Sequence, residues 1–264
     1  DAFNLGVTFV ENEGPVFTNP VSKPIDVDNL IAFNPDELNY VYEAVTNIKN
    51  SLPENIPLIG FCGSPWTLAA YSIEGRSSKD FKKTIRFVEN NQESTHLLLT
   101  KFTDACYLYL RKQVKAGADV IQIFDSWANL LDAKNLRNFS LNYTKSLISA
   151  LKQDPLTANT PIILFSREPK CDEQTLINTS ADCISLYWDM VDFDINIARD
   201  KVAIQGNLDP KVLLESKDLI KEEAYKILNK YEGYPGYIFN LGHGITPNIN
   251  PDNVKFLTDV VREY

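Results

Sequence analysis

The chain has 264 residues, 44% of them hydrophobic, which is enough to bury a substantial apolar core and argues against disorder. Its formal net charge of −9 argues against a nucleic-acid partner, because phosphate contacts need clustered Lys and Arg side chains. Four widely spaced cysteines predict free thiols in a reducing compartment. Since no apolar run is long enough to span a membrane, we expect a soluble, cytoplasmic protein.

Six short apolar runs predict β-strands. Each run is continuously apolar instead of alternating with polar residues, which is typical of strands buried on both faces of a parallel sheet. The runs are 56–62, 119–124, 161–165, 183–188, 201–206 and 236–241.

Helical periodicity fills the segments between these runs. Asn34, Ser216 and Asn250 each predict a helix N-cap, and the first and third are followed by proline, which favours the first helical turn. Ser77, with Asp80 three residues later, resembles a capping box. Helices that alternate with buried strands predict an α/β fold, and because no linker interrupts the chain we expect a single domain over 1–264.

Two architectures fit this alternation, a (β/α)8 barrel and an open doubly wound sheet. In a barrel, the loops that follow all strands meet at one face and build the active site, whereas an open sheet binds its ligand at one crevice. Polar or conformationally special residues follow all six predicted strands, which favours the barrel. They are Gly63-Ser64-Pro65-Trp66, Asp125-Ser126-Trp127, Ser166-Arg167, Asp189, Gln205-Gly206-Asn207-Leu208-Asp209 and Gly242-His243-Gly244.

A barrel of this type needs eight strands, so we expect two βα units, of roughly 30 residues each, to be absent from the N-terminal side. The sequence also starts without methionine, at Asp1. We therefore interpret the chain as a fragment or a processed product with about six βα units.

Four segments carry long, specific motifs: GFCGSPWTLAAYSIEG (60–75), QIFDSWANLL (122–131), QGNLDP (205–210) and NLGHGITPNINPDNVKFLTDVVREY (240–264). Together with the opening DAFNLGVTFVENEGPVF (1–17), they resemble the uroporphyrinogen decarboxylase family of haem and porphyrin biosynthesis. The resemblance covers essentially the whole chain in one register. The N-terminal part of the family's chain is the part that this sequence lacks.

The resemblance implies a (β/α)8 TIM-type barrel that forms a homodimer through its active-site faces. It also implies a carboxy-lyase, which removes carboxyl groups from the four acetate side chains of uroporphyrinogen III to give coproporphyrinogen III, with no metal and no organic cofactor. Tyr71, Ser126 and His243 match family positions that line the substrate and contact its carboxylates. Arg167 matches more loosely, near a position where the family usually has a basic residue.

The sequence departs from the family at its start. The family's arginine-containing loop after the first strand, and its aspartate after the second strand, fall in the absent region. Asp1 lies a few residues beyond the place of that aspartate, so it is not assigned the role. We accordingly expect the 264-residue chain by itself to be inactive.

Two other classes of function remain open from the sequence. One is a non-catalytic paralogue that binds a tetrapyrrole. The other is a zinc-dependent corrinoid-protein methyltransferase of the same barrel superfamily, which would hold zinc with a His-x-Cys pair and a distant cysteine. The second is weaker, because Leu98 and Ile245 stand two positions after His96 and His243.

Overall fold

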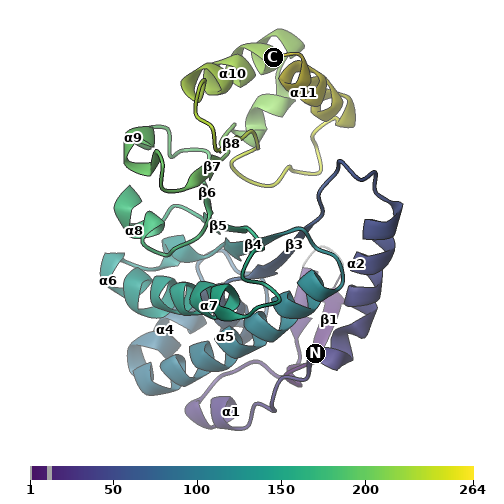
Figure 1. Ribbon diagram of the computed structural model, residues 1–264. Helices are drawn as coiled ribbons and strands as arrows, with labels where there is room; N and C mark the ends of the chain where they lie inside the picture. Colours follow the sequence, from purple (N-terminus) through teal and green to yellow (C-terminus); the bar gives the residue numbers. More distant parts are fainter. Residues whose placement is uncertain (1, 11–13) are drawn as a thin grey trace.

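The computed structural model describes residues 2–10 and 14–264 (Figure 1), so Asp1 lies outside the described residues. Its main sheet has six parallel strands in the order β3-β4-β5-β6-β7-β8, and each strand lies beside the strand that precedes it in the sequence. Parallel neighbours require crossover connections, so the chain repeats one βα unit. The strands are β3 (Ile59–Gly63), β4 (Val120–Asp125), β5 (Ile162–Ser166), β6 (Cys183–Ser185), β7 (Ala203–Gln205) and β8 (Tyr237–Ile238).

All six predicted strands are confirmed, but the last three are shorter than the apolar runs that predict them. The ladders between β5, β6 and β7 pair three residues each, and the ladder between β7 and β8 pairs two. The rest of each apolar run leaves the ladder and continues as loop. Apolar composition therefore predicts burial, whereas strand length depends on where backbone pairing stops.

A two-stranded hairpin, β1 (Val7–Val10) and β2 (Gly14–Phe17), precedes the main sheet and is antiparallel. The end of β2 and the segment that follows it are linked to the helix after β3 by backbone hydrogen bonds. Phe17 N–H donates to the Gly75 carbonyl at 2.8 Å, and Val21 N–H donates to the Ser72 carbonyl at 2.9 Å. The sequence does not predict this hairpin, because its pairing depends on contacts with distant residues.

A helix or helical turn connects each strand of the main sheet to the next (Figure 1). The α-helices are α1 (Pro24–Asp28), α2 (Asn39–Ser51), α3 (Pro65–Glu74), α4 (Lys82–Asn90), α5 (Gln92–Lys115), α6 (Ala133–Asn135), α7 (Asn142–Gln153), α8 (Glu173–Ile177), α9 (Ile195–Ala198), α10 (Lys217–Lys230) and α11 (Pro251–Glu263). Short 3₁₀ turns are η1 (Pro35–Leu38), η2 (Ala128–Leu130) and η4 (Pro210–Leu214), and η3 (Leu136–Leu141) is a π-helical segment.

Three predicted N-caps are confirmed, and one is wrong. The side chains of Asn34, Ser216 and Asn250 each accept a hydrogen bond from a backbone N–H in the turn that follows. Ser77 does not cap α4. The N-cap is Phe81, a fully buried residue with a positive φ of 47°, and its N–H donates to the Ser78 hydroxyl at 3.2 Å. Burial of the Phe81 ring outweighs its left-handed backbone and moves the helix start beyond the expected capping box.

The expectation that every strand is buried on both faces is wrong for β3 and for β8, whose Ile238 is 44% exposed. Gly60 and Cys62 face α5, but Ile59 is 44% exposed and Phe61 is 60% exposed. The reason is position, because β3 is one edge of the six-stranded sheet and β8 is the other. The inner strands β4 and β5 are buried as predicted.

Two apolar clusters hold the molecule together. The larger cluster joins the strands to α3, α5 and α7, and its fully buried side chains include Trp66, Leu110 and Ile148. The smaller cluster packs η4, α10 and α11 against one another beyond β8, at the top of Figure 1. The loop between β8 and α11 is therefore anchored at both ends, which matters because His243 lies in it.

Candidate active site

The carboxyl ends of the parallel strands bring together residues that are far apart in the sequence. The Tyr71 ring packs edge-on against the Trp127 ring, with 5.8 Å between centroids. The Arg167 guanidinium carbon lies 5.7 Å from the Trp127 ring centroid and 5.8 Å from the Tyr187 ring centroid. Tyr187 in turn meets the His243 ring edge-on at 5.9 Å. We call these five residues the aromatic wall.

Arg167 is the cation of the aromatic wall. It follows β5 directly, its side chain is 29% exposed, and its backbone N–H donates to the Asp125 carbonyl at 3.0 Å. Its Nε is buried and has no hydrogen-bond partner among the described residues, and the Glu168 carboxylate lies 3.7 Å away. A guanidinium held between two ring faces with an unused donor is suited to bind an anion such as a carboxylate.

His243 lies on an exposed turn beside the wall. Its ring lies 6.4 Å from the Phe165 ring, and its Nδ1 is 3.5 Å from the Gly244 carbonyl. Packing requires a glycine at position 242, because a Cβ atom at Gly242 would lie 2.4 Å from the backbone nitrogen of Trp188. The imidazole is therefore positioned by a tightly packed backbone while its ring remains available to a ligand.

Ser126 lies at the end of β4, half-buried and adjacent to Trp127. Its backbone N–H donates to the Thr67 hydroxyl at 2.9 Å, which links the β4 loop to the first turn of α3. The same connection is reinforced by Trp66, whose indole N–H donates to the Trp127 carbonyl at 2.8 Å. Tyr71, Ser126, Arg167 and His243, the residues that the sequence predicts for the site, thus lie on neighbouring segments at one face.

Asp125 precedes Ser126 and is fully buried. Its Oδ1 accepts hydrogen bonds from the Ser64 hydroxyl at 2.9 Å and the Thr67 hydroxyl at 3.5 Å. Its Oδ2 accepts from the Ser140 hydroxyl at 2.5 Å and the Ser166 hydroxyl at 3.5 Å. Burial raises the pKa of this carboxyl, and the four hydroxyl groups oppose that increase by stabilising the ionised form.

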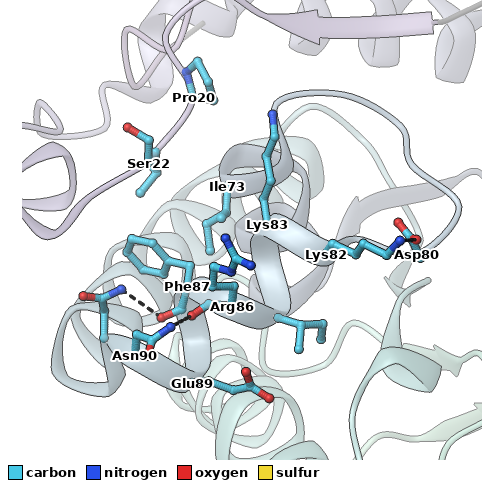
Figure 2. A pocket seen from close by; sticks show the side chains of 13 residues that line it. Pro20, Ser22, Ile73, Asp80, Lys82, Lys83, Arg86, Phe87, Glu89 and Asn90 are labelled. Atoms are coloured by element: carbon cyan, nitrogen blue, oxygen red, sulfur yellow. Dashed lines mark hydrogen bonds and ion pairs between the residues drawn. The ribbon is translucent and has the colours of Figure 1, made fainter.

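A cavity of about 1040 Å³ lies elsewhere, between the Pro20–Ser22 segment and α4. Figure 2 shows Lys83 extending from α4 on the side of Pro20, whereas Lys82 turns toward Asp80, with which it forms an ion pair at 2.9 Å. None of the aromatic wall residues lines this cavity. A second cavity of about 400 Å³ is lined by Tyr71 and by apolar side chains of β3 and α5. The larger hollow is therefore separate from the candidate active site.

Three further observations concern His96, metal binding and membrane spans. His96 bonds through Nδ1 to the Tyr143 hydroxyl at 2.7 Å, and its ring packs at a tilt against the Phe139 ring, with 5.0 Å between centroids, as expected of a structural histidine. Within residues 2–10 and 14–264, no three His, Cys, Asp or Glu side chains gather in a way that could hold a metal ion. Among the same residues, no helix is long and apolar enough to cross a membrane.

Sequence reasoning missed two residues of this face. Tyr187 lies inside an apolar run and looks like core, although it contacts both Arg167 and His243. Asp125 was visible as an acidic residue at a strand end, which is the signal that could have found it. Its hydroxyl partners lie up to 61 residues away, so the sequence did not reveal its surroundings.

Solved structures share this fold at low sequence identity. A methyltransferase from Methanosarcina mazei superposes with a TM-score of 0.76 at 20% identity, over 99% of this chain and 76% of that one. A B12-independent methionine synthase from Shewanella sp. W3-18-1 gives a TM-score of 0.57 at 12% identity, over 97% and 74% of the two chains. At these identities the likeness shows the fold alone, and it supports the expected barrel-type α/β architecture, of which this chain is a part.

Sequence comparison gives a more specific result. The chain is 42% identical over 266 residues to the uroporphyrinogen decarboxylase of Vesicomyosocius okutanii subsp. Calyptogena okutanii, covering all of this chain and 76% of that protein. It is 41% identical over 268 residues to the uroporphyrinogen decarboxylase of Legionella pneumophila (strain Corby), covering 75% of that protein. The family model described as "Uroporphyrinogen decarboxylase (URO-D)" matches residues 1–264. The chain belongs to the uroporphyrinogen decarboxylase family.

Proposed function

We propose that this protein removes the carboxyl groups from the four acetate side chains of uroporphyrinogen III, giving coproporphyrinogen III. The proposal is supported by family membership over residues 1–264 and by relatives at 41 to 42% identity that bear the name of this enzyme. The observation that carries it is the aromatic wall, which joins a cation, a phenol and an imidazole at the carboxyl ends of the strands.

The chemistry uses the substrate's own pyrrole ring. Protonation of a ring carbon makes the ring an electron sink, so the bond between the acetate methylene and its carboxyl carbon breaks and releases CO2. The electron pair enters the ring, a proton is added at the methylene, and the ring proton is lost, so each acetate exchanges CO2 for H⁺ and becomes a methyl group. The protein has to orient carboxylates, supply protons and exclude water.

The aromatic wall is suited to hold such a substrate. Its aromatic rings, which meet edge-on, give an apolar surface for a tetrapyrrole, and the Arg167 guanidinium, whose side chain is 29% exposed, would pair with an acetate or propionate carboxylate. The Tyr71 hydroxyl and the His243 imidazole would donate to other carboxylates around the ring, and Ser126 would contribute a further donor. These assignments are proposals that rest on the resemblance and on the shared location of the four residues.

The test is anaerobic incubation of uroporphyrinogen III with the protein expressed from its complete reading frame, followed by oxidation and chromatography of the porphyrins. We expect stepwise loss of four carboxyl groups by the wild type and slower loss by His243→Ala. His96→Ala is the matched control, because this histidine bonds to Tyr143 on α7, away from the wall. No decarboxylation by folded wild-type protein would reject the enzyme proposal, whereas equal rates in both variants would reject only the role of His243.

We further propose that the protein is a cytoplasmic homodimer whose active-site faces pack together. The resemblance supports the dimer, and four free cysteines agree with a reducing compartment. Exposed apolar side chains on the loops after β6, β7 and β8 support the choice of face: Val191, Leu214 and Ile245.

A further inference from the structure

We infer that Asp125 is a positioning residue for the proposed reaction: its buried carboxylate fixes the loops that carry Ser126 and Arg167. The inference rests on the proposed decarboxylase function and adds to it a residue that makes no contact with the substrate. Asp125 is fully buried, so it acts only through the groups bonded to it.

The hydrogen bonds of the Asp125 carboxylate join three separate segments to the end of β4. Ser64 and Thr67 belong to the start of α3, Ser166 ends β5, and Ser140 lies in the π-helical segment η3. Each hydroxyl donates to one carboxylate oxygen, so each of the two oxygens accepts two hydrogen bonds. A carboxylate can accept from all four groups at once, whereas an amide has only one acceptor oxygen.

Two of these bonded segments lead directly to the aromatic wall. Thr67 donates to Asp125 and accepts from the Ser126 N–H, so one hydroxyl ties the carboxylate to the loop of Ser126. On the other side, the Ser166 hydroxyl donates to Asp125 Oδ2 at 3.5 Å, and Arg167 is the next residue along the chain. Loss of the carboxylate would therefore loosen the start of α3, the loop after β4 and the end of β5 together. Three of the five wall residues lie on or directly after these segments: Tyr71, Trp127 and Arg167.

This arrangement differs from an ordinary buried ion pair. No Lys or Arg side chain is bonded to Asp125 in the part of the chain that the structure describes, so only hydroxyl groups compensate for the cost of burying the carboxyl. A merely stabilising residue at this place could be apolar at lower cost. A carboxylate that gathers four donors instead serves to fix geometry, as the orienting groups behind many active sites do.

The test compares Asp125→Asn with two other variants in the porphyrin assay. Ser140→Ala removes the 2.5 Å hydrogen bond from a segment that does not belong to the wall. Asp154→Asn is the matched control, since the Asp154 side chain is only 8% exposed, accepts from the Tyr107 hydroxyl and the Arg111 Nε–H, and lies between α7 and the start of β5, away from the wall. Thermal unfolding of each variant is measured beside kcat and KM.

We expect Asp125→Asn to lower kcat by about tenfold or more at temperatures well below its Tm, because small displacements of oriented groups are costly to catalysis. Ser140→Ala should lower kcat less, and the double variant should resemble Asp125→Asn, since both changes act through one carboxylate. Asp154→Asn should lower the Tm but keep the wild-type kcat. If the folded Asp125→Asn and Ser140→Ala proteins both keep the wild-type kcat, the inference is wrong even though the enzyme proposal stands; if the wild type shows no turnover, the enzyme proposal itself fails.

Discussion

At the scale of single residues, Gly242 and Gly244 flank His243 but face different surroundings. A Cβ atom at Gly242 would lie 2.4 Å from the Trp188 nitrogen and 2.5 Å from its Cα, whereas a Cβ atom at Gly244 meets nothing within 4 Å. We expect Gly242→Ala to destabilise the protein by about 1–3 kcal/mol or more, because backbone cannot yield as a flexible side chain can. Gly244→Ala should leave the Tm nearly unchanged, and thermal unfolding followed by circular dichroism measures both. Equal Tm values for the two variants would show that the His243 turn is loosely packed.

The same scale shows which parts of the site the sequence could predict. Ser126 and Arg167 follow neighbouring parallel strands, so a correct strand assignment was sufficient to place them at one face. The surroundings of Asp125 were beyond sequence reasoning, because its hydroxyl partners come from three different segments of the chain. Their common acceptor became visible only when the fold brought those segments together.

At the scale of elements, Asp154 joins α5 to the end of α7. Its Oδ2 accepts from the Arg111 Nε–H at 2.6 Å and the Tyr107 hydroxyl at 2.8 Å, and its Oδ1 accepts from the Leu156 N–H at 2.9 Å. The pKa of this carboxyl lies below its usual value of 3.8. The hydrogen bond from the Leu156 N–H contributes most to this decrease, and the Tyr107 hydroxyl and Arg111 contribute less. A carboxyl whose pKa is lower in the folded state than in the unfolded state stabilises the fold at pH values above the unfolded-state pKa. This stabilisation is lost as the pH falls through the folded-state pKa.

Asp154→Asn should therefore lower the Tm at pH 7, and the difference from wild type should shrink as the pH falls below 3.8. Asp259→Asn is the control, since Asp259 forms an exposed i,i+4 pair with Lys255 at 3.7 Å and such pairs contribute little. The measurement is Tm against pH for the three proteins. A Tm difference for Asp154→Asn that stays constant across the whole pH range would contradict a charge-based link between α5 and α7.

Sequence prediction located some helices and strands correctly and others wrongly. Periodicity and N-cap residues located α10 and α11 well, because capping is a local interaction between neighbouring residues. Sequence prediction failed at α4, where burial of Phe81 between Tyr71 and Trp127 decides where the helix starts. It also failed at β3, where the strand's place at a sheet edge exposes the side chains of Ile59 and Phe61. Both outcomes depend on tertiary contacts that no short window of sequence contains.

At the scale of the whole molecule, the proposed dimer makes a prediction about its surface. Ile245 is 54% exposed on the loop after β8, beside His243, and Ile48 is 49% exposed on α2, outside the face formed by the loops that follow the strands. If the active-site faces pack together, Ile245 is buried by the partner and Ile48 remains in water. Burial of an isoleucine side chain contributes ~1.5–3 kcal/mol, so Ile245→Glu should raise the dimer dissociation constant by about tenfold or more.

Sedimentation velocity over a concentration series measures this constant for the wild type and both variants. Ile48→Glu should sediment as the wild type does, whereas Ile245→Glu should shift toward the monomer as the protein is diluted. Because the loop that carries Ile245 also carries His243 of the proposed site, dimer dissociation should also lower kcat for uroporphyrinogen III in the same dilution series. A wild type that is monomeric at every concentration would reject the dimer, and a dimer weakened by Ile48→Glu instead would place its interface on the helical side of the molecule.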